Sequence, residues 1–410
     1  MNKQEQNVLN SLFDLSTIRS KAKHLLELAK KDKLNYFTFH ADKMDSTAAY
    51  IVEVIQQNYP DLMIPYHSRW RHFEIDGIDR IGTLLTELAA VSEEEKGRIL
   101  YELVIISVFL DAGAGTQWHY QEAKSGNHYA RSEGLALASL AAYQNGCFSA
   151  QSNHPYRVDA SKLLALTKNE LECIFQVTAD NPLEGIQGRL NLLHQLGEAI
   201  QNNPVFFGAD GRLGNFYPFI LSLVSRQQLS AKTLFSHVLQ AFNSIWPARH
   251  HFANIPLGDV WLHSALKSNE AGSEFMPFHK LSQWLTYSLM EPLERAGIEI
   301  TQMDALTGLP EYRNGGLLID TGLLTLKDKK QASLTHEPGS ELIVEWRALT
   351  VALLDELALL IRNQLKQTSH SLPLAKILQG GTWQAGRRIA QQKRAQGTPP
   401  LSIISDGTVF

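Results

Sequence analysis

Residues 340 to 361 read S-E-L-I-V-E-W-R-A-L-T-V-A-L-L-D-E-L-A-L-L-I, which is the clearest helical pattern in the chain. Its apolar residues lie on most sides, so the sequence predicts a mostly buried helix over residues 339 to 366. Outward from this stretch, apolar residues recur at every third or fourth position, whereas alternating strand patterns are scarce. We therefore predict a mainly α, multi-helix globular protein with roughly a dozen helices and no internal repeats.

Helix boundaries can also be read from local signals. Ser92 with Glu95, and Thr167 with Glu170, form capping boxes at the starts of two helices. Residues 131 to 144 contain many small side chains and predict a helix that packs closely against a neighbour. Another predicted helix runs from Pro277 to Leu293, because proline is tolerated in the first turn.

The length of 410 residues, with 44% hydrophobic and 20% charged residues, allows a large core and two sub-domains. Residues 203 to 218 are rich in Gly, Pro and Phe, which predicts a linker or a long binding loop. We therefore expect helical parts at 1–202 and 219–410, packed as one compact unit.

The formal net charge of −4 gives no basic surface for nucleic acid or an anionic membrane. The only cysteines, Cys147 and Cys173, form no C-x-x-C pair, so neither a disulfide framework nor a thiolate zinc site is expected. The first residues also lack the pattern of a secretory signal. We expect a soluble, cytoplasmic protein without a cofactor, while the sequence leaves the oligomeric state open.

Residues 309 to 324, L-P-E-Y-R-N-G-G-L-L-I-D-T-G-L-L, provide the main candidate for an active site. Pro310 and the two glycines predict a turn that leaves the polar side chains between them free to face a ligand. These side chains are Glu311, Tyr312, Arg313 and Asn314. The alternative is a loop whose charges only pair with neighbours.

Residues 64 to 77, I-P-Y-H-S-R-W-R-H-F-E-I-D-G, place His67, Arg69 and Arg71 among aromatic rings. Guanidinium groups fit phosphate oxygens and stack on rings, so this segment is a candidate anion-binding site. The alternative is a short surface strand with its basic residues facing outward.

Two further segments contain candidate residues. Asp111 follows a predicted helix, at the negative end of its dipole, which is unfavourable unless the acid has a partner or a role. It precedes Trp118 and His119, and this histidine could be either structural or functional. The helix from Pro277 carries polar and aromatic candidates that could face a cavity or solvent, namely His279, Lys280, Gln283 and Trp284.

Several of these motifs together resemble the uracil catabolism protein 4 family of fungi and bacteria, over nearly the whole chain. The motifs are P-Y-H-S-R-W-R-H-F (65–73), D-A-G-A-G (111–115), R-S-E-G-L-A (131–136), P-F-H-K-L-S-Q-W-L (277–285), L-T-G-L-P-E-Y-R-N-G-G (306–316) and the terminal S-D-G-T-V-F. The resemblance implies a component of a route that opens the pyrimidine ring and releases urea by way of a ribosylurea-type intermediate.

The helix at 277–285 and the stretch from Pro310 to Leu324 are also similar to the queuosine salvage nucleoside glycosidases. These proteins are mainly helical relatives of helix-hairpin-helix DNA glycosylases, so the resemblance implies a core of that type. Glu311 falls on the catalytic aspartate of the family, and Lys280 and Gln283 fall on its helix positions. This chain differs in having Glu for Asp and N-G-G for V-P-Q.

The resemblance implies hydrolysis of the N-glycosidic bond of ribosylurea or ribosylurea 5-phosphate. A carboxylate at Glu311 would stabilise positive charge on the sugar carbon C1 or position the attacking water. The proton for the departing urea would come from His279, Lys280 or Asp111. The walls of the substrate pocket would be formed by Trp118, Trp284 and Tyr312, and a phosphate would be held by Arg69, Arg71 or Arg313. Further contacts with the substrate are expected from His67, Gln283 and Asn314.

Two alternatives remain from the sequence. One is an amidohydrolase that attacks a ureido carbonyl with metal-bound water, using His67, His72, His119 or His263. No H-E-x-x-H motif supports a metal site, so we favour a reaction without metal. The other alternative is a non-catalytic ligand-binding or scaffold protein of the same pathway. A role on DNA is disfavoured by the acidic net charge.

Overall fold

The computed structural model of the chain describes residues 1–111, 113–247 and 249–404. These residues are mainly helical with only short strands, which confirms the predicted fold class. The terminal motif at 405–410 and position 112 of the D-A-G-A-G motif lie outside the described residues. Within the described part, no helix has the length and apolar composition required to cross a bilayer. A glycosylase-like core stays a prediction.

Contacts divide the chain into two compact units, each assembled from segments that are distant in sequence. Among the described residues, unit 1 comprises 1–67, 249–283 and 302–404, and unit 2 comprises 68–111, 113–247 and 284–301. One boundary falls inside helix α14 (Lys280–Arg295), between Gln283 and Trp284. The contacts therefore do not divide the chain at residues 203–218.

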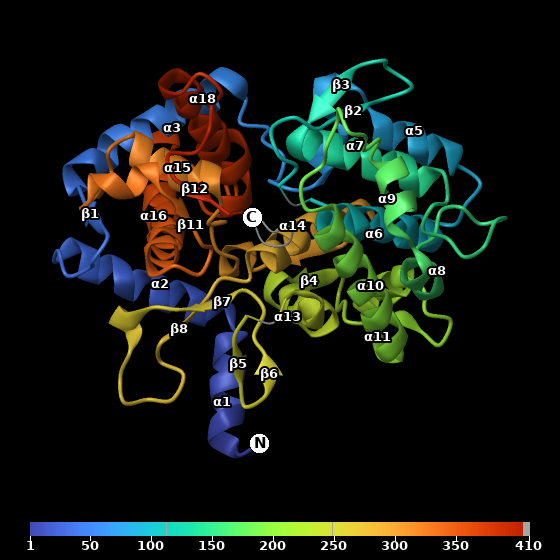
Figure 1. Cartoon of the computed structure of the whole chain (residues 1–410), viewed down its shortest axis with the longest axis horizontal. Helices are drawn as coiled ribbons and strands as arrows, with labels where there is room; N and C mark the ends of the chain where they lie inside the picture. The colour runs from blue at the N-terminus through green and yellow to red at the C-terminus, as the bar shows by residue number, and fades with distance from the viewer. Residues whose placement is uncertain (112, 248, 405–410) are drawn as a thin grey trace. The chain divides into compact units, whose positions relative to one another are not determined.

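The long predicted helix is α16 (Glu341–Leu365), which lies at the centre of unit 1. It packs against α2 (Leu15–Lys30) and α3 (Met44–Asn58), and α15 (Tyr312–Asp320) packs against α18 (Trp383–Lys393) (Figure 1). The remaining helices of this unit are α1 (Lys3–Leu12), α17 (Leu374–Ile377) and the π-helical turn η8 (Leu378–Thr382).

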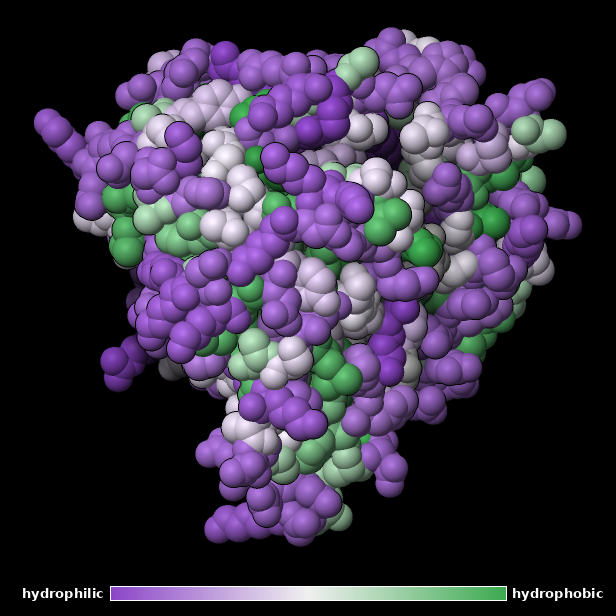
Figure 2. All heavy atoms as spheres, turned by 60° about the vertical axis from the view of Figure 1, so that its left-hand side comes forward, coloured by the Kyte–Doolittle hydropathy of each residue, from purple (hydrophilic) through white to green (hydrophobic). Residues whose placement is uncertain are grey.

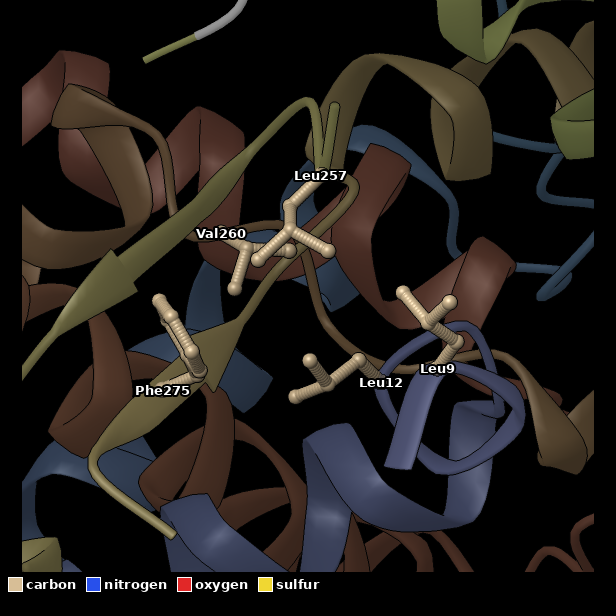
Figure 3. Packing of buried hydrophobic residues seen from close by; sticks show 5 residues of the cluster. All are labelled: Leu9, Leu12, Leu257, Val260 and Phe275. Atoms are coloured by element: carbon tan, nitrogen blue, oxygen red, sulfur yellow. The ribbon is translucent and has the colours of Figure 1, made fainter. Parts of the chain in front are cut away.

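Helix α1 is held by a small apolar cluster that joins it to strands β7 and β8 (Figure 3). Leu9 and Leu12 come from α1, Val260 and Phe275 come from the two strands, and Leu257 precedes β7. All five are at least 90% buried. Burial of such side chains contributes roughly 1.5–3 kcal/mol each, so this cluster is sufficient to fix the terminal helix.

Unit 2 is built around α6 (Glu93–Phe109), whose residues from Ile99 onward are all buried. It packs against α7 (Arg131–Gln144), the predicted small-residue helix, and α12 (Phe216–Leu221). The other helices are α4 (Trp70–Phe73), α5 (Arg80–Glu87), α8 (Ala160–Ala165), α9 (Lys168–Ile174), α10 (Ile186–Asn202), α11 (Pro204–Phe207) and α13 (Ala231–Phe242).

Residues 203 to 218, predicted to be a linker or binding loop, contain α11, the turn η3 (Leu213–Asn215) and the start of α12. Phe207, Leu213 and Phe216 from this segment are buried. The aromatic residues that suggested a loop therefore contribute to the core of unit 2.

The strands of the described residues form separate two-stranded pairs. The antiparallel pairs are β1 (Phe37–Phe39) with β10 (Leu324–Leu326), β2 (His119–Gln121) with β3 (His128–Ala130), β5 (His251–Phe252) with β6 (Ile255–Pro256), and β7 (Val260–Leu262) with β8 (Phe275–Pro277). The parallel pairs are β4 (Gln228–Ser230) with β9 (Glu299–Thr301), and β11 (Thr335–His336) with β12 (Ser402–Ile403).

Short 3-10 turns connect these elements: η1 (Ala41–Lys43), η2 (Ile75–Gly77), η4 (Asn243–Ile245), η5 (Ser264–Leu266), η6 (Met303–Ala305) and η7 (Lys329–Ser333). Hydrophilic residues cover most of the face in Figure 2, and apolar residues appear there in small groups. Such scattered apolar groups are normal on a folded protein.

Candidate functional site

Glu311 is the N-cap residue of α15 in unit 1. Its Oε2 accepts a hydrogen bond from the backbone N–H of Arg313 (2.7 Å), and its Oε1 accepts one from Asn314 (2.6 Å). The carboxylate therefore occupies the positive end of the helix, where backbone N–H groups favour an anion. This contact explains why a polar residue follows Pro310.

The Glu311 residue is partly exposed. Burial raises the pKa of its carboxyl group, while the two backbone N–H groups and the charges of Lys280 and Arg313 oppose that shift. Because a carboxylate has about four lone-pair positions, two remain after the helix cap is made. The group can thus accept from water or a ligand while still capping the helix.

Lys280, whose charge acts on Glu311, is the first residue of α14 and is 8% exposed. Its backbone N–H donates to Oδ2 of Asp259 (2.9 Å). Asp259 also receives both terminal nitrogens of Arg347, each at 2.8 Å, and the indole N–H of Trp261 (2.6 Å). Although burial opposes ionisation, Arg347 lowers the pKa of Asp259 well below its usual range.

Sequence reasoning did not assign Asp259 and Arg347 to the site. They lie 88 positions apart, so no local pattern relates them. The available signal was Arg347 itself, since a charged residue inside an apolar helix requires a buried partner.

The start of α14 differs from the prediction. Pro277 ends strand β8 and the helix begins at Lys280. His279 adopts φ +47°, in the left-handed region, and its N–H and that of Phe278 donate to the Asp259 carbonyl. A helix cannot pass through a left-handed residue, so the predicted start at Pro277 is wrong.

His279 is 2% exposed, and its Nε2 lies 2.9 Å from the Leu12 carbonyl. Burial lowers the pKa of this imidazole. Gln283 is fully buried, and its side-chain amide donates to Phe278 and Thr307 and accepts from Thr307. Gln283 therefore holds the loop that leads to Glu311.

The residues that follow Glu311 lie in α15, so the predicted turn between Pro310 and the two glycines is wrong, and their side chains have different environments. Tyr312 is 36% exposed. Asn314 is fully buried, where it donates to the Leu309 carbonyl (3.0 Å) and accepts from the Thr382 hydroxyl (2.8 Å). Arg313 is 5% exposed, and its Nη1 donates to the Gly397 carbonyl (2.8 Å). Asn314 and Arg313 thus tie α15 to the C-terminal part of unit 1.

His67 also belongs to unit 1. Its Nδ1 lies 2.9 Å from Oε1 of Gln379, and its ring centroid lies 6.0 Å from that of Trp383. Burial lowers the pKa of His67 to about 4. The imidazole is therefore neutral near pH 7.

In unit 2, the structure brings together Arg69, Asp111 and Trp284. Arg69 is fully buried, with Nη1 2.9 Å from Oδ1 of Asp111 and Cζ 5.7 Å from the Trp284 ring centroid. Its Nε donates to the Ser107 hydroxyl (2.7 Å). Asp111 thus has the partner that its position at the end of α6 requires.

Arg71 forms separate contacts with acidic residues of unit 2. Its Nη2 donates to Oε2 of Glu291 (2.7 Å), its Nη1 lies 3.2 Å from Glu74, and Ser68 donates to Oε1 of Glu291. Burial raises the pKa of Glu291 to about 7, against the opposing effects of Arg71 and Ser68. The sequence analysis missed Glu291, although it lies on the same face of α14 as Trp284, two helical turns further along.

Segment 70–73 is helical, so the alternative of a short surface strand does not apply.

Trp118 has the environment of a core residue in unit 2. It is 1% exposed, its indole N–H donates to the Phe175 carbonyl (2.8 Å), and it packs against Gly134. A Cβ atom at Gly134 would lie 2.9 Å from the Trp118 ring, so the small residue is required there. In this structure the indole has almost no surface to offer a substrate.

The histidines of the metal-dependent alternative have separate partners. His67 contacts Gln379, His263 lies 3.5 Å from Glu345, His72 packs edge-on against Trp284, and His119 lies near His128. The described residues contain no group of three or more His, Cys, Asp or Glu side chains that could hold a metal ion.

The predicted residues thus form two groups. Glu311, Tyr312, Arg313, Asn314, Lys280, Gln283, His279 and His67 belong to unit 1, and Arg69, Arg71, Asp111, Trp118 and Trp284 belong to unit 2. Within unit 1, Glu311 and Lys280 combine a carboxylate and a cation, whereas Gln283, Asn314 and Arg313 hold the surrounding backbone.

Comparison with known proteins adds relatives that span nearly the whole chain. A family model described as "Protein of unknown function (DUF1688)" matches residues 11–410. The chain is 39% identical over 407 residues to "Protein urg3" of Schizosaccharomyces pombe (strain 972 / ATCC 24843), covering 97% of this chain and 98% of that protein. It is 36% identical over 439 residues to "Uracil catabolism protein 4" of Lachancea kluyveri, covering 98% and 99%. These matches confirm the family resemblance seen in the motifs.

Proposed function

This chain belongs to the family described as "Protein of unknown function (DUF1688)", and from that membership we propose that it is an enzyme of uracil catabolism. The name of the relative from Lachancea kluyveri supports the pathway. We propose further that the enzyme hydrolyses the N-glycosidic bond of ribosylurea and releases urea.

This proposal rests on the hydrogen bonds and the exposure of Glu311. Its carboxylate is fixed by two backbone N–H groups and keeps lone pairs for a further contact, and the residue as a whole is partly exposed. Breakage of the bond between C1 and nitrogen builds positive charge on the sugar, which a fixed carboxylate stabilises without having to reorganise. The same group can orient the water whose oxygen bonds to C1.

The departing urea nitrogen requires a proton. Lys280 is the best supported donor, because its charge acts on Glu311 within the same unit. Burial lowers the pKa of His279 and so favours its neutral form, and Asp111 is paired with Arg69. Neither of these two groups is therefore as well suited to give up a proton.

Ribosylurea is favoured over its 5-phosphate by the partners of the predicted phosphate ligands. Arg69 is paired with Asp111, and Arg71 is paired with Glu291. Arg313 is 5% exposed and donates to a backbone carbonyl. A phosphate at either of the first two arginines would lie beside a carboxylate that is already paired there, and repulsion between the two anions costs electrostatic energy.

The test is to incubate the purified protein with ribosylurea and, separately, with its 5-phosphate while urea is measured. We expect urea from ribosylurea and a loss on the order of 10³-fold in Glu311→Gln, as for removal of a charged catalytic group. The matched control is Asp14→Asn, which changes another N-cap carboxylate of unit 1 and should leave turnover unchanged. Equal urea release by the wild type and Glu311→Gln would remove the glycosidase proposal.

A second candidate function is ligand binding without catalysis. It is favoured by the cap itself, because both Glu311 oxygens already serve α15 and such contacts stabilise helices without chemistry. This candidate predicts that calorimetry detects ribosylurea binding while no urea appears. It also predicts that Glu311→Gln binds the ligand as the wild type does.

A further inference from the structure

The hairpin of β2 and β3 in unit 2 has two unlike faces. Tyr120 and Tyr129 are directly paired and lie on the buried face, at 7% and 6% exposure. His119 and His128 lie on the exposed face, one on each strand. Because side chains alternate along a strand, the two imidazoles share this face on a diagonal of the register.

The spacing of the two rings suits one bound ion. Their centroids are 5.1 Å apart and the rings are inclined at 56°. Zinc binds imidazole nitrogen at about 2.0–2.1 Å in tetrahedral geometry, which places the centroids of two such rings about 5 Å apart. The separation of the two rings is therefore the one that a shared ion requires.

The proton arrangement of His119 also favours an ion. Its Nδ1 lies 3.4 Å from the Gln117 carbonyl oxygen, which can only accept a hydrogen bond. Where Nδ1 donates to this oxygen, Nε2 carries the lone pair and is available to an ion. Histidine ligands of metals show this arrangement, in which the second ring nitrogen donates to a carbonyl or carboxylate.

The strand that carries His119 is held in place before any ion binds. The Asn181 side chain accepts from the His119 N–H and donates to the His119 carbonyl, both at 2.9 Å. The Gln176 side chain does the same for Gln121, at 2.9 and 3.0 Å. Binding of an ion would therefore cost little conformational entropy at this strand.

We propose that His119 and His128 bind one divalent transition-metal ion, such as Zn²⁺, Ni²⁺ or Cu²⁺, on the outer face of the hairpin. Imidazole ligands select this class of ion over Mg²⁺ or Ca²⁺. With two protein ligands, water completes the coordination, so the ion is exchangeable. The site is independent of the reaction proposed for Glu311.

The test is calorimetric titration of the full-length, untagged protein with Zn²⁺ and with Ni²⁺. We expect one site per chain whose affinity falls at least tenfold in His119→Ala and in His128→Ala. The matched control is His154→Ala, which removes another exposed histidine of unit 2 and should leave that site unchanged. Circular dichroism of each variant establishes that the fold is retained.

A gain-of-ligand variant sharpens the test. Gln121 is the direct partner of His128 in the register and its side chain is exposed on the same face. Gln121→His should therefore tighten Zn²⁺ binding at least tenfold, because it adds a third imidazole. Electron paramagnetic resonance of the wild type with one equivalent of Cu²⁺ should show coupling to two imidazole nitrogens.

The proposal is overturned if His119→Ala and His128→Ala bind Zn²⁺ and Ni²⁺ as the wild type does. It is also overturned if His154→Ala removes the site equally, because binding would then be distributed over the 15 histidines of the chain. In either case the contact between the two rings is only a packing contact.

Discussion

Burial raises the pKa of both Glu102 in unit 2 and Glu311 in unit 1, but their oxygens are satisfied differently. Glu102 is fully buried, and Arg212 donates to both of its oxygens at 2.9 and 3.1 Å. The Tyr143 hydroxyl and the N–H groups of Val158 and Gly214 complete its partners. Glu311 has two backbone donors and is partly exposed.

The difference separates a structural carboxylate from a candidate functional one. Five hydrogen bonds, two of them from the Arg212 guanidinium, leave Glu102 no capacity for a ligand. Glu311 keeps that capacity, because its two donors among the described residues are the backbone N–H groups of the helix cap. Burial is therefore common to both carboxylates, and unused acceptor capacity is what makes Glu311 the candidate.

The largest loss of stability should come from breaking the hydrogen-bond network around Glu102. Glu102→Gln leaves Arg212 without its buried carboxylate, so we expect the free energy of unfolding to fall by about 3–5 kcal/mol. Urea denaturation measures this loss. Glu93→Gln, an exposed change on the same helix, should be within about 0.5 kcal/mol of the wild type. A loss below about 1 kcal/mol for Glu102→Gln would refute the structural role.

A pH-dependent effect is expected from Glu291, which is buried but less fully paired. Its pKa is about 7 in the folded protein against an ordinary value of 4.5, so the folded state holds the proton more tightly. The stabilising contribution is present below about pH 4.5 and is lost as the pH rises to about 7.

Glu291→Gln should remove this dependence, changing the difference in unfolding free energy from the wild type by roughly 2–3 kcal/mol between about pH 4.5 and 8. Urea denaturation at several pH values measures it. Glu198→Gln, an exposed change on α10 of the same unit, serves as the control. If the free energy of unfolding changed with pH in the same way in the wild type and in Glu291→Gln, Glu291 would not be the source of the pH dependence.

A smaller effect should follow from Trp118→Phe. The change leaves the buried Phe175 carbonyl without its donor, so the unfolding free energy should fall by about 1–2 kcal/mol. Turnover of ribosylurea per folded molecule should stay unchanged. A selective rise in KM without loss of stability would instead favour the substrate contact predicted from the sequence.

The smallest change in stability should come from Glu311→Gln, since the amide oxygen still accepts one backbone hydrogen bond at the cap. We expect a loss of at most about 1 kcal/mol, measured by urea denaturation. Glu311→Ser retains a good cap and should be equally stable, yet equally inactive. A loss comparable to that of Glu102→Gln would assign Glu311 to the core instead.

Local signals in the sequence were sufficient for much of the helical structure. The capping box at Thr167 is present, Ser92 caps α6, and the stretch predicted over 339–366 is helical over Glu341–Leu365. These features depend on contacts within one or two turns. The start of α14 was missed because it depends on Asp259, which lies 21 positions earlier.

The sequence by itself determined the helical class and the family, because each depends on patterns of neighbouring residues. Only the tertiary structure decided which polar side chains already have hydrogen-bond partners within the protein. Arg313, Asn314 and Gln283 carry the same polar groups whether they meet backbone or ligand, and their partners come from 24 to 84 positions away or from an adjacent loop. Hydrogen-bond capacity is a property of the residue, but its use depends on what the fold places beside it.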